Sequence, residues 1–142
     1  MAQVNTKVVH IQGVTFNALT ASNHWVPLDG PTEFGGSNAA ARPKELVLVA
    51  LAGCTGSDVI SMLTKMREPV RRFEVHIEAQ MAETHPKVYT EIEVIFKVWG
   101  EGIKEENLKK AIKLSSETYC AVSAMLRAAV KISETYQINP AE

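Results

Sequence analysis

The chain has 142 residues, of which 46% are hydrophobic and 22% are charged. This composition is ordinary for a folded globular protein and excludes a disordered or collagen-like class. Fifteen basic and sixteen acidic side chains leave a formal charge of −1, so the sequence has no electrostatic footprint for nucleic acid or an anionic membrane. We expect neither partner. A chain of this length can bury a real core, and we expect one domain over residues 1–142.

The first part of the chain predicts a short antiparallel sheet. Apolar runs bounded by turn residues indicate three strands, and Gly13 marks a bend or bulge between the first two. The runs are Lys7–Ile11, Val14–Phe16 and Trp25–Leu28. A loop over residues 29–42 follows, and it is too long to be a simple connection, which favours a loop that borders a site. The first residues lack the apolar core of a signal peptide, so we expect a cytoplasmic protein.

Residues 43–66 predict a long central helix. Pro43 suits the first helical position, and Glu45 interacts favourably with the positive end of the helix dipole. The run Leu46–Cys54 is almost wholly apolar, so we expect the helix to be covered on nearly every side. This run by itself is too short to span a bilayer.

The second half of the chain predicts a long β-hairpin, two helices and a closing strand. Apolar and polar residues alternate over 73–82 and 88–98, with a turn at 84–87, and one face of this hairpin should pack on the central helix. Helical spacing follows over 103–116 and 119–127. Alternation over 130–138, interrupted at Glu134, indicates the last strand. The order of elements predicts an α+β fold.

Two cysteines carry the possible chemistry. Cys54 lies within the central helix, where an apolar face becomes polar, and Cys120 lies in a later helix. In a reducing cytosol, two such residues are catalytic or buried free thiols rather than a structural disulfide. Gly53 and Gly56 flank Cys54 and weaken the helix by about 1 kcal/mol each, which indicates either close approach of another helix or access of a ligand to the sulfur.

The residues around these cysteines resemble those of a known family. The segments Arg42-Pro43-Lys44-Glu45-Leu46 and Ala50-Leu51-Ala52-Gly53-Cys54-Thr55-Gly56, followed by Cys120, are similar to the OsmC/Ohr family of osmotically induced and organic-hydroperoxide-resistance proteins. The similarity extends over nearly the whole chain. It implies an intertwined homodimer with two long central helices at its core and active sites at the subunit interface.

The resemblance also implies a function. Cys54 would be the peroxidatic thiol and Cys120 the resolving one in a thiol-dependent peroxidase that reduces organic hydroperoxides, with an external thiol or dithiol as reductant and no metal or cofactor. Peroxidase members use an N-terminal arginine and a glutamate at the start of the central helix. No arginine precedes Arg42 here, and Lys44 occupies the usual glutamate position, with Glu45 beside it. Arg42, Lys44 and Glu45 are therefore the candidates for activating the thiol or binding substrate.

Two other functions stay open at this point. A non-catalytic dimer of the same fold would hold a small apolar ligand at Cys54, and the lack of an early arginine favours it. A cysteine–histidine hydrolase would need Cys54, one of the four histidines and Asp58, but a carboxylate one turn away raises a thiol pKa. The histidines are too widely spaced to form a local zinc-ligand pair with a cysteine.

Overall fold

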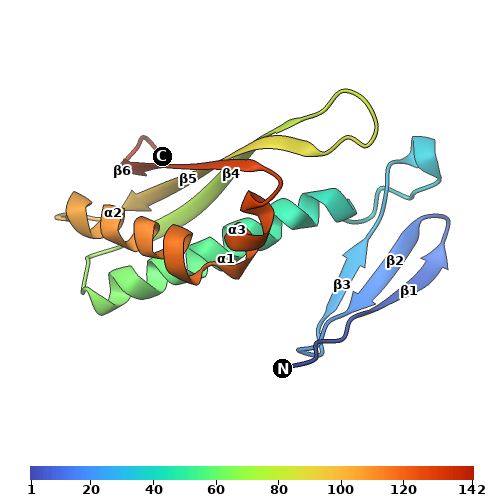
Figure 1. Cartoon of the computed structure of the whole chain (residues 1–142), viewed down its shortest axis with the longest axis horizontal. Helices are drawn as coiled ribbons and strands as arrows, with labels where there is room; N and C mark the ends of the chain where they lie inside the picture. The colour runs from blue at the N-terminus through green and yellow to red at the C-terminus, as the bar shows by residue number, and fades with distance from the viewer. The chain divides into compact units, whose positions relative to one another are not determined.

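The computed structural model describes residues 1–142 and has the predicted α+β class, with two three-stranded sheets (Figure 1). The chain separates into two compact units, Met1–Val47 and Leu48–Glu142. The expectation of a single domain over 1–142 stays a prediction.

The first unit contains the three predicted strands. They are β1 (Lys7–Gln12), β2 (Thr15–Leu19) and β3 (Trp25–Leu28), paired antiparallel in the order β1-β2-β3. The pairing register shifts between His10 and Gln12, and Gly13 adopts a φ of 50°, so the predicted bend is confirmed. A short 3₁₀ helix, η1 (Thr32–Phe34), interrupts the predicted loop.

One buried carboxylate organises the loop after β3. Asp29 is 1% exposed, and its oxygens accept hydrogen bonds from the Thr15 hydroxyl and from backbone N–H groups in the loop. The backbone donors are Gly30 at 2.7 Å, Ser37 at 3.2 Å and Ala39 at 3.0 Å. Burial by itself raises the pKa of Asp29, but these hydrogen bonds outweigh it and lower that pKa to about 2. The loop is therefore fixed by an ionised side chain.

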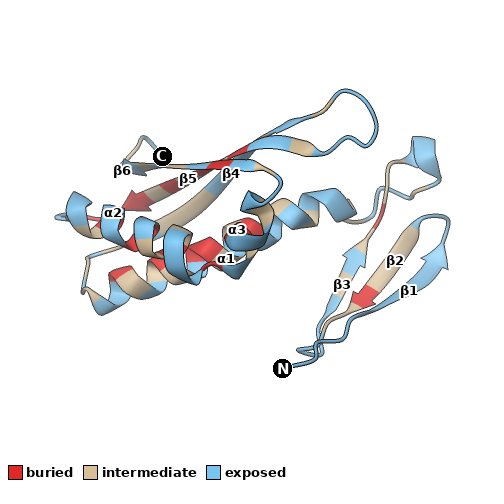
Figure 2. Ribbon diagram, viewed as in Figure 1, coloured by how far each residue is buried: buried red, intermediate tan, exposed pale blue.

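The central helix α1 spans Pro43–Lys65, within one residue of the prediction. Its coverage differs from the expectation. Leu51, Val59 and Leu63 are buried, but Val49 is 60% exposed. Only 28% of the most apolar stretch of the helix is buried, because the sheet packs on one side of the helix (Figure 2). The mean hydropathy of that stretch is 1.9, so the helix is long and apolar enough to cross a membrane by length and composition alone, a test that core helices of soluble proteins also pass.

The second unit contains the predicted hairpin and closing strand. Strands β4 (Arg72–Met81) and β5 (Tyr89–Trp99) pair antiparallel, and β6 (Lys131–Ile138) lies parallel to β5. A parallel neighbour requires a crossover connection, which consists here of α2 (Glu105–Leu114), a π-helical turn η2 (Ser115–Tyr119) and α3 (Ala121–Arg127). The first of the two predicted helices thus ends as a π turn, and Cys120 precedes the second helix as its cap instead of lying within it.

The core of this unit lies between the sheet and two helices on the same face, α1 and α2 (Figure 1). Alternate residues of β5 are fully buried, as the hairpin pattern predicts. The core side chains are Leu51, Val59, Leu63, Ile92, Val94, Phe96, Val98, Leu108, Ala111, Ile112 and Ile132.

The interruption predicted at Glu134 does not break the last strand. β6 continues through Glu134, whose carboxylate accepts a hydrogen bond from the Arg127 guanidinium. Arg127 also donates to the Ile132 carbonyl at 2.9 Å. The charge at this half-buried position is therefore paired, which lets the strand alternation include an acidic residue.

Candidate active site

Cys54 lies on α1 between two glycines with different surroundings. Its side chain is half-buried. A Cβ added at Gly56 would lie 3.0 Å from Val75 Cγ2, whereas one added at Gly53 would meet nothing within 4 Å. Gly56 thus lets α1 approach strand β4, so the element that comes close is a strand and not the helix considered from the sequence. Gly53 leaves the surface beside the thiol open.

Cys120 is the buried member of the pair. Its residue is 3% exposed, its N–H donates to the Ser115 carbonyl at 2.9 Å, and its sulfur accepts a hydrogen bond from the Ser123 N–H at 3.3 Å. The π turn from Ser115 to Tyr119 ends at this residue. Such turns occur often at functional sites.

The fold brings Cys54 and Cys120 together. Desolvation raises the pKa of the Cys120 thiol most, and the neighbouring Cys54 thiol and Asp58 carboxylate raise this pKa further. The Ser123 N–H opposes these effects only in part, so the pKa of Cys120 reaches about 11. Both cysteines are free. The buried thiol therefore stays protonated at neutral pH, and Cys54 is the thiol of the two that solvent reaches.

A chain of polar side chains lies beside the two thiols and was not predicted. Ser115 Oγ donates to Asp58 Oδ2 at 2.8 Å and lies 3.0 Å from Thr55 Oγ1. Ser115 is fully buried and Thr55 is 5% exposed. In the sequence, Thr55 and Ser115 look like ordinary small polar residues. The Thr55 hydroxyl next to Cys54 indicates a site only once its partner in the π turn, Ser115, is known.

The three candidates for activating the thiol, Arg42, Lys44 and Glu45, lie at the start of α1 and belong to the first unit. The Glu45 carboxylate accepts a hydrogen bond from the Arg42 N–H at 2.9 Å, so it caps the helix. The Arg42 guanidinium donates to the Ala40 carbonyl at 3.0 Å and to Asn38 Oδ1 at 2.7 Å. Lys44 occupies the first turn of the helix. Their role toward the thiols stays a prediction.

The histidines give the hydrolase alternative no support. The ring of His10 lies 2.9 Å from the Gly13 carbonyl, His24 lies 3.0 Å from the Ser22 hydroxyl, and His76 lies 2.6 Å from Glu74. Three of the four histidines thus have local partners in their own turns and strands.

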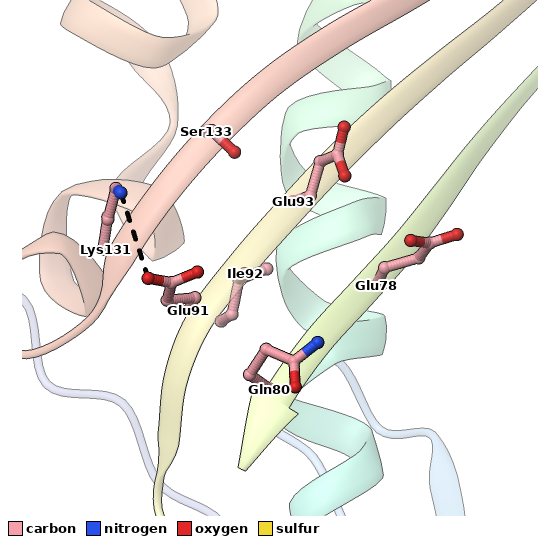
Figure 3. Close-up of a pocket in the computed structure, with 7 residues that line it drawn as sticks. All are labelled: Glu78, Gln80, Glu91, Ile92, Glu93, Lys131 and Ser133. Atoms are coloured by element: carbon pink, nitrogen blue, oxygen red, sulfur yellow. Dashed lines mark ion pairs between the residues drawn. The ribbon is translucent and has the colours of Figure 1, made fainter.

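Two cavities in the second unit differ in their relation to the thiols. One of about 320 Å³ is lined by Asp58, Ser61, Met62, Lys65, Leu114 and Tyr119, and so borders the polar chain described above. The other, of about 220 Å³, lies on the outer sheet face among Glu78, Glu91 and Glu93, with Lys131 3.9 Å from Glu91 (Figure 3). The charged side chains that line this second cavity belong to the solvent-exposed face of the sheet. No cluster of three or more histidine, cysteine or acidic side chains is arranged to hold a metal ion.

The fold and the paired thiols define a small α+β protein with a two-cysteine site. Residues 35–135 match the family model described as OsmC-like protein, and the chain belongs to this family. It is 35% identical over 135 residues to protein YhfA of Escherichia coli strain K12, covering 95% of this chain and 98% of that protein.

Solved structures agree with the assignment. A hypothetical protein from Aquifex aeolicus is 28% identical with a TM-score of 0.85, and all of both chains is covered. An organic hydroperoxide resistance protein OsmC from Legionella pneumophila is 17% identical with a TM-score of 0.67, covering 96% of this chain and 98% of that one. This last likeness shows the fold alone.

Proposed function

We propose that this protein is a thiol-dependent peroxidase that reduces organic hydroperoxides, with Cys54 as the peroxidatic and Cys120 as the resolving residue. The observation that carries the proposal is that the segments bearing a half-buried thiol and a buried thiol meet, with Thr55 Oγ1 3.0 Å from Ser115 Oγ. The name of the Legionella pneumophila structure, an organic hydroperoxide resistance protein, is consistent with this substrate class.

The reaction divides into two steps at sulfur. The Cys54 thiolate attacks one oxygen of the hydroperoxide, an S–O bond forms while the O–O bond breaks, and the leaving alkoxide takes a proton to become the alcohol. The Cys120 sulfur then attacks the Cys54 sulfenic acid, and the hydroxyl leaves with the Cys120 proton as water. An external thiol or dithiol reduces the resulting disulfide.

The apolar surface of α1 supports both an alkyl substrate and a second copy of the chain. Val49 and Ala50 are exposed on the helix that carries Cys54. An apolar helix of this length is normally buried, so we infer a homodimer in which a second subunit covers it and completes the site. Light scattering at micromolar concentration tests this inference, and a stable monomer would contradict it.

A second candidate function has one observation in its favour. Arg42 is the first arginine of the chain, and its guanidinium is bonded to Ala40 and Asn38 within its own loop. A protein whose thiol lacks an activating cation would be a dimeric binding protein for a small apolar ligand. Arg42, Lys44 and Glu45 remain the residues to test for activation.

Counting free thiols separates the two functions. One equivalent of cumene hydroperoxide should remove both thiols from the wild-type protein and release one equivalent of alcohol. The Cys54→Ser variant should consume no hydroperoxide, because a hydroxyl is far less nucleophilic than a thiolate. A wild-type protein that keeps both thiols would leave the binding function as the better account.

A further inference from the structure

The polar chain at Thr55, Ser115 and Asp58 has a defined direction. Each hydroxyl has a single proton to donate, and an ionised carboxylate only accepts. Ser115 gives its proton to Asp58 Oδ2, so the proton between Thr55 and Ser115 must come from Thr55. Thr55 therefore donates to Ser115, and Ser115 donates to Asp58.

This chain joins the backbones that carry the two thiols. Thr55 is the residue after Cys54 on α1, and Ser115 is the first residue of the π turn. The Ser115 carbonyl accepts the Cys120 N–H at 2.9 Å, across that turn. A shift of Ser115 away from α1 would therefore carry the Cys120 backbone with it.

We propose that Ser115, held between Thr55 and Asp58, is a positioning residue that sets Cys120 against Cys54 for disulfide formation. The proposal rests on the proposed function, in which Cys120 resolves the Cys54 sulfenic acid. Ser115 itself touches neither the hydroperoxide nor the reacting sulfur atoms.

Disulfide formation is the step that needs this precision. It requires Cα atoms about 4.4 to 6.8 Å apart and a narrow range of sulfur dihedral angles. Attack of Cys54 on a hydroperoxide does not require Cys120 at a fixed distance. Loss of the polar chain should therefore slow the second step and leave the first one unchanged.

Two variants remove the chain at different points. Thr55→Val keeps the side-chain shape and removes the hydroxyl, and Ser115→Ala removes the central link. Thr64→Val is the matched control, because Thr64 lies on the same helix, is exposed, and donates only to the Ile60 carbonyl at 2.8 Å. Thr55→Val serves alone if Ser115→Ala does not fold, because it removes the hydroxyl that donates to Ser115.

The readout separates the two steps. After one equivalent of cumene hydroperoxide, sulfenic acid trapped with dimedone reports the first step, and mass spectrometry of the disulfide reports the second. Thr55→Val and Ser115→Ala should form sulfenic acid at the wild-type rate and close the disulfide about tenfold more slowly. Thr64→Val should match the wild type in both. A general loss of folding would instead slow both steps.

Diamide tests the geometry without a hydroperoxide. It oxidises two neighbouring thiols to a disulfide and is itself reduced to the hydrazine, so the result does not depend on peroxidase activity. Slower closure with diamide in Ser115→Ala supports the positioning role even if hydroperoxide does not react with the protein. Closure at the wild-type rate in both Ser115→Ala and Thr55→Val, with diamide, would overturn it.

Discussion

The Cys54 and Cys120 thiols lie close enough to interact, although one lies on the central helix and the other caps a helix near the end of the chain. Only Cys54 is partly open to solvent. This arrangement supports the proposed division of roles, because reaction with a hydroperoxide needs access to solvent while disulfide formation needs close approach of the second sulfur.

The raised pKa of Cys120 predicts a loss of stability at alkaline pH. A thiol whose pKa rises from 9.0 to about 11 on folding contributes stability below pH 9 that is lost as the pH rises through 11. Removing the thiol with Cys120→Ala should reduce this loss between pH 9 and 11 by an amount on the order of 2 kcal/mol. Urea unfolding of both reduced proteins across this range measures the difference. Parallel pH curves would contradict the assignment.

Asp29 predicts the opposite behaviour in acid. Its pKa is about 2 in the folded protein, so its contribution is complete above an unfolded value near 4 and is lost as the pH falls through 2. Asp29→Asn should lower stability at pH 7 and flatten the dependence between pH 4 and 2.

Glu33→Gln is the control for Asp29→Asn, because Glu33 is acidic and exposed in the same loop. It should follow the wild-type curve. Equal effects of the two substitutions would show that net charge and not the Asp29 hydrogen bonds governs the acid response.

Glu45 predicts a separation between capping and catalysis. Glu45→Ala removes the acceptor for the Arg42 N–H and should cost about 1 kcal/mol, whereas Glu45→Gln keeps an acceptor and should cost less than about 0.5 kcal/mol. Thermal unfolding measures both. If Glu45→Gln is stable but loses hydroperoxide consumption, the carboxylate charge acts on the thiol. Equal destabilisation by both substitutions would exclude the capping role.

The two glycines beside Cys54 should differ in how well they tolerate a larger side chain. Gly56→Leu would force a side chain against Val75 and should destabilise the protein by about 1 to 3 kcal/mol. A Cβ at Gly53 meets nothing within 4 Å in its own subunit, so Gly53→Leu should leave the stability of the subunit itself unchanged or raise it by up to about 0.5 kcal/mol, because leucine favours a helix. Urea unfolding of the monomeric or dimeric protein at fixed concentration compares the pair. Destabilisation of similar size at both positions would contradict the packing described here.

The sequence predicted those parts of the fold that follow from local patterns. Alternation around Ile92 and Phe96 placed the hairpin, and Pro43 placed the start of α1 to the residue. The parallel pairing of β6 and the π turn at Ser115 depend on contacts between distant segments, which have no local signature. The exposure of Val49 was not predicted either. An apolar run indicates that a helix must be buried, but not whether its own chain or a second subunit buries it.

The same distinction holds for the site. Cys54 and Cys120 became candidates because thiols are chemically distinctive and because the residues around them resemble the OsmC/Ohr family. Thr55 and Ser115 are common residues whose role appears only when α1 and the π turn meet. Asp58 was considered only as a member of a hydrolase site, because its partner Ser115 is far away in the sequence.

The mass of the protein after one equivalent of cumene hydroperoxide tests the central claim most directly. If Cys54 reacts and Cys120 resolves it, the wild-type mass should fall by two hydrogens with both thiols lost, and Cys120→Ser should gain oxygen at Cys54 and proceed to sulfinic acid with excess hydroperoxide. A wild-type protein that gains only oxygen at one equivalent would contradict the account, because Cys120 would then take no part in the reaction.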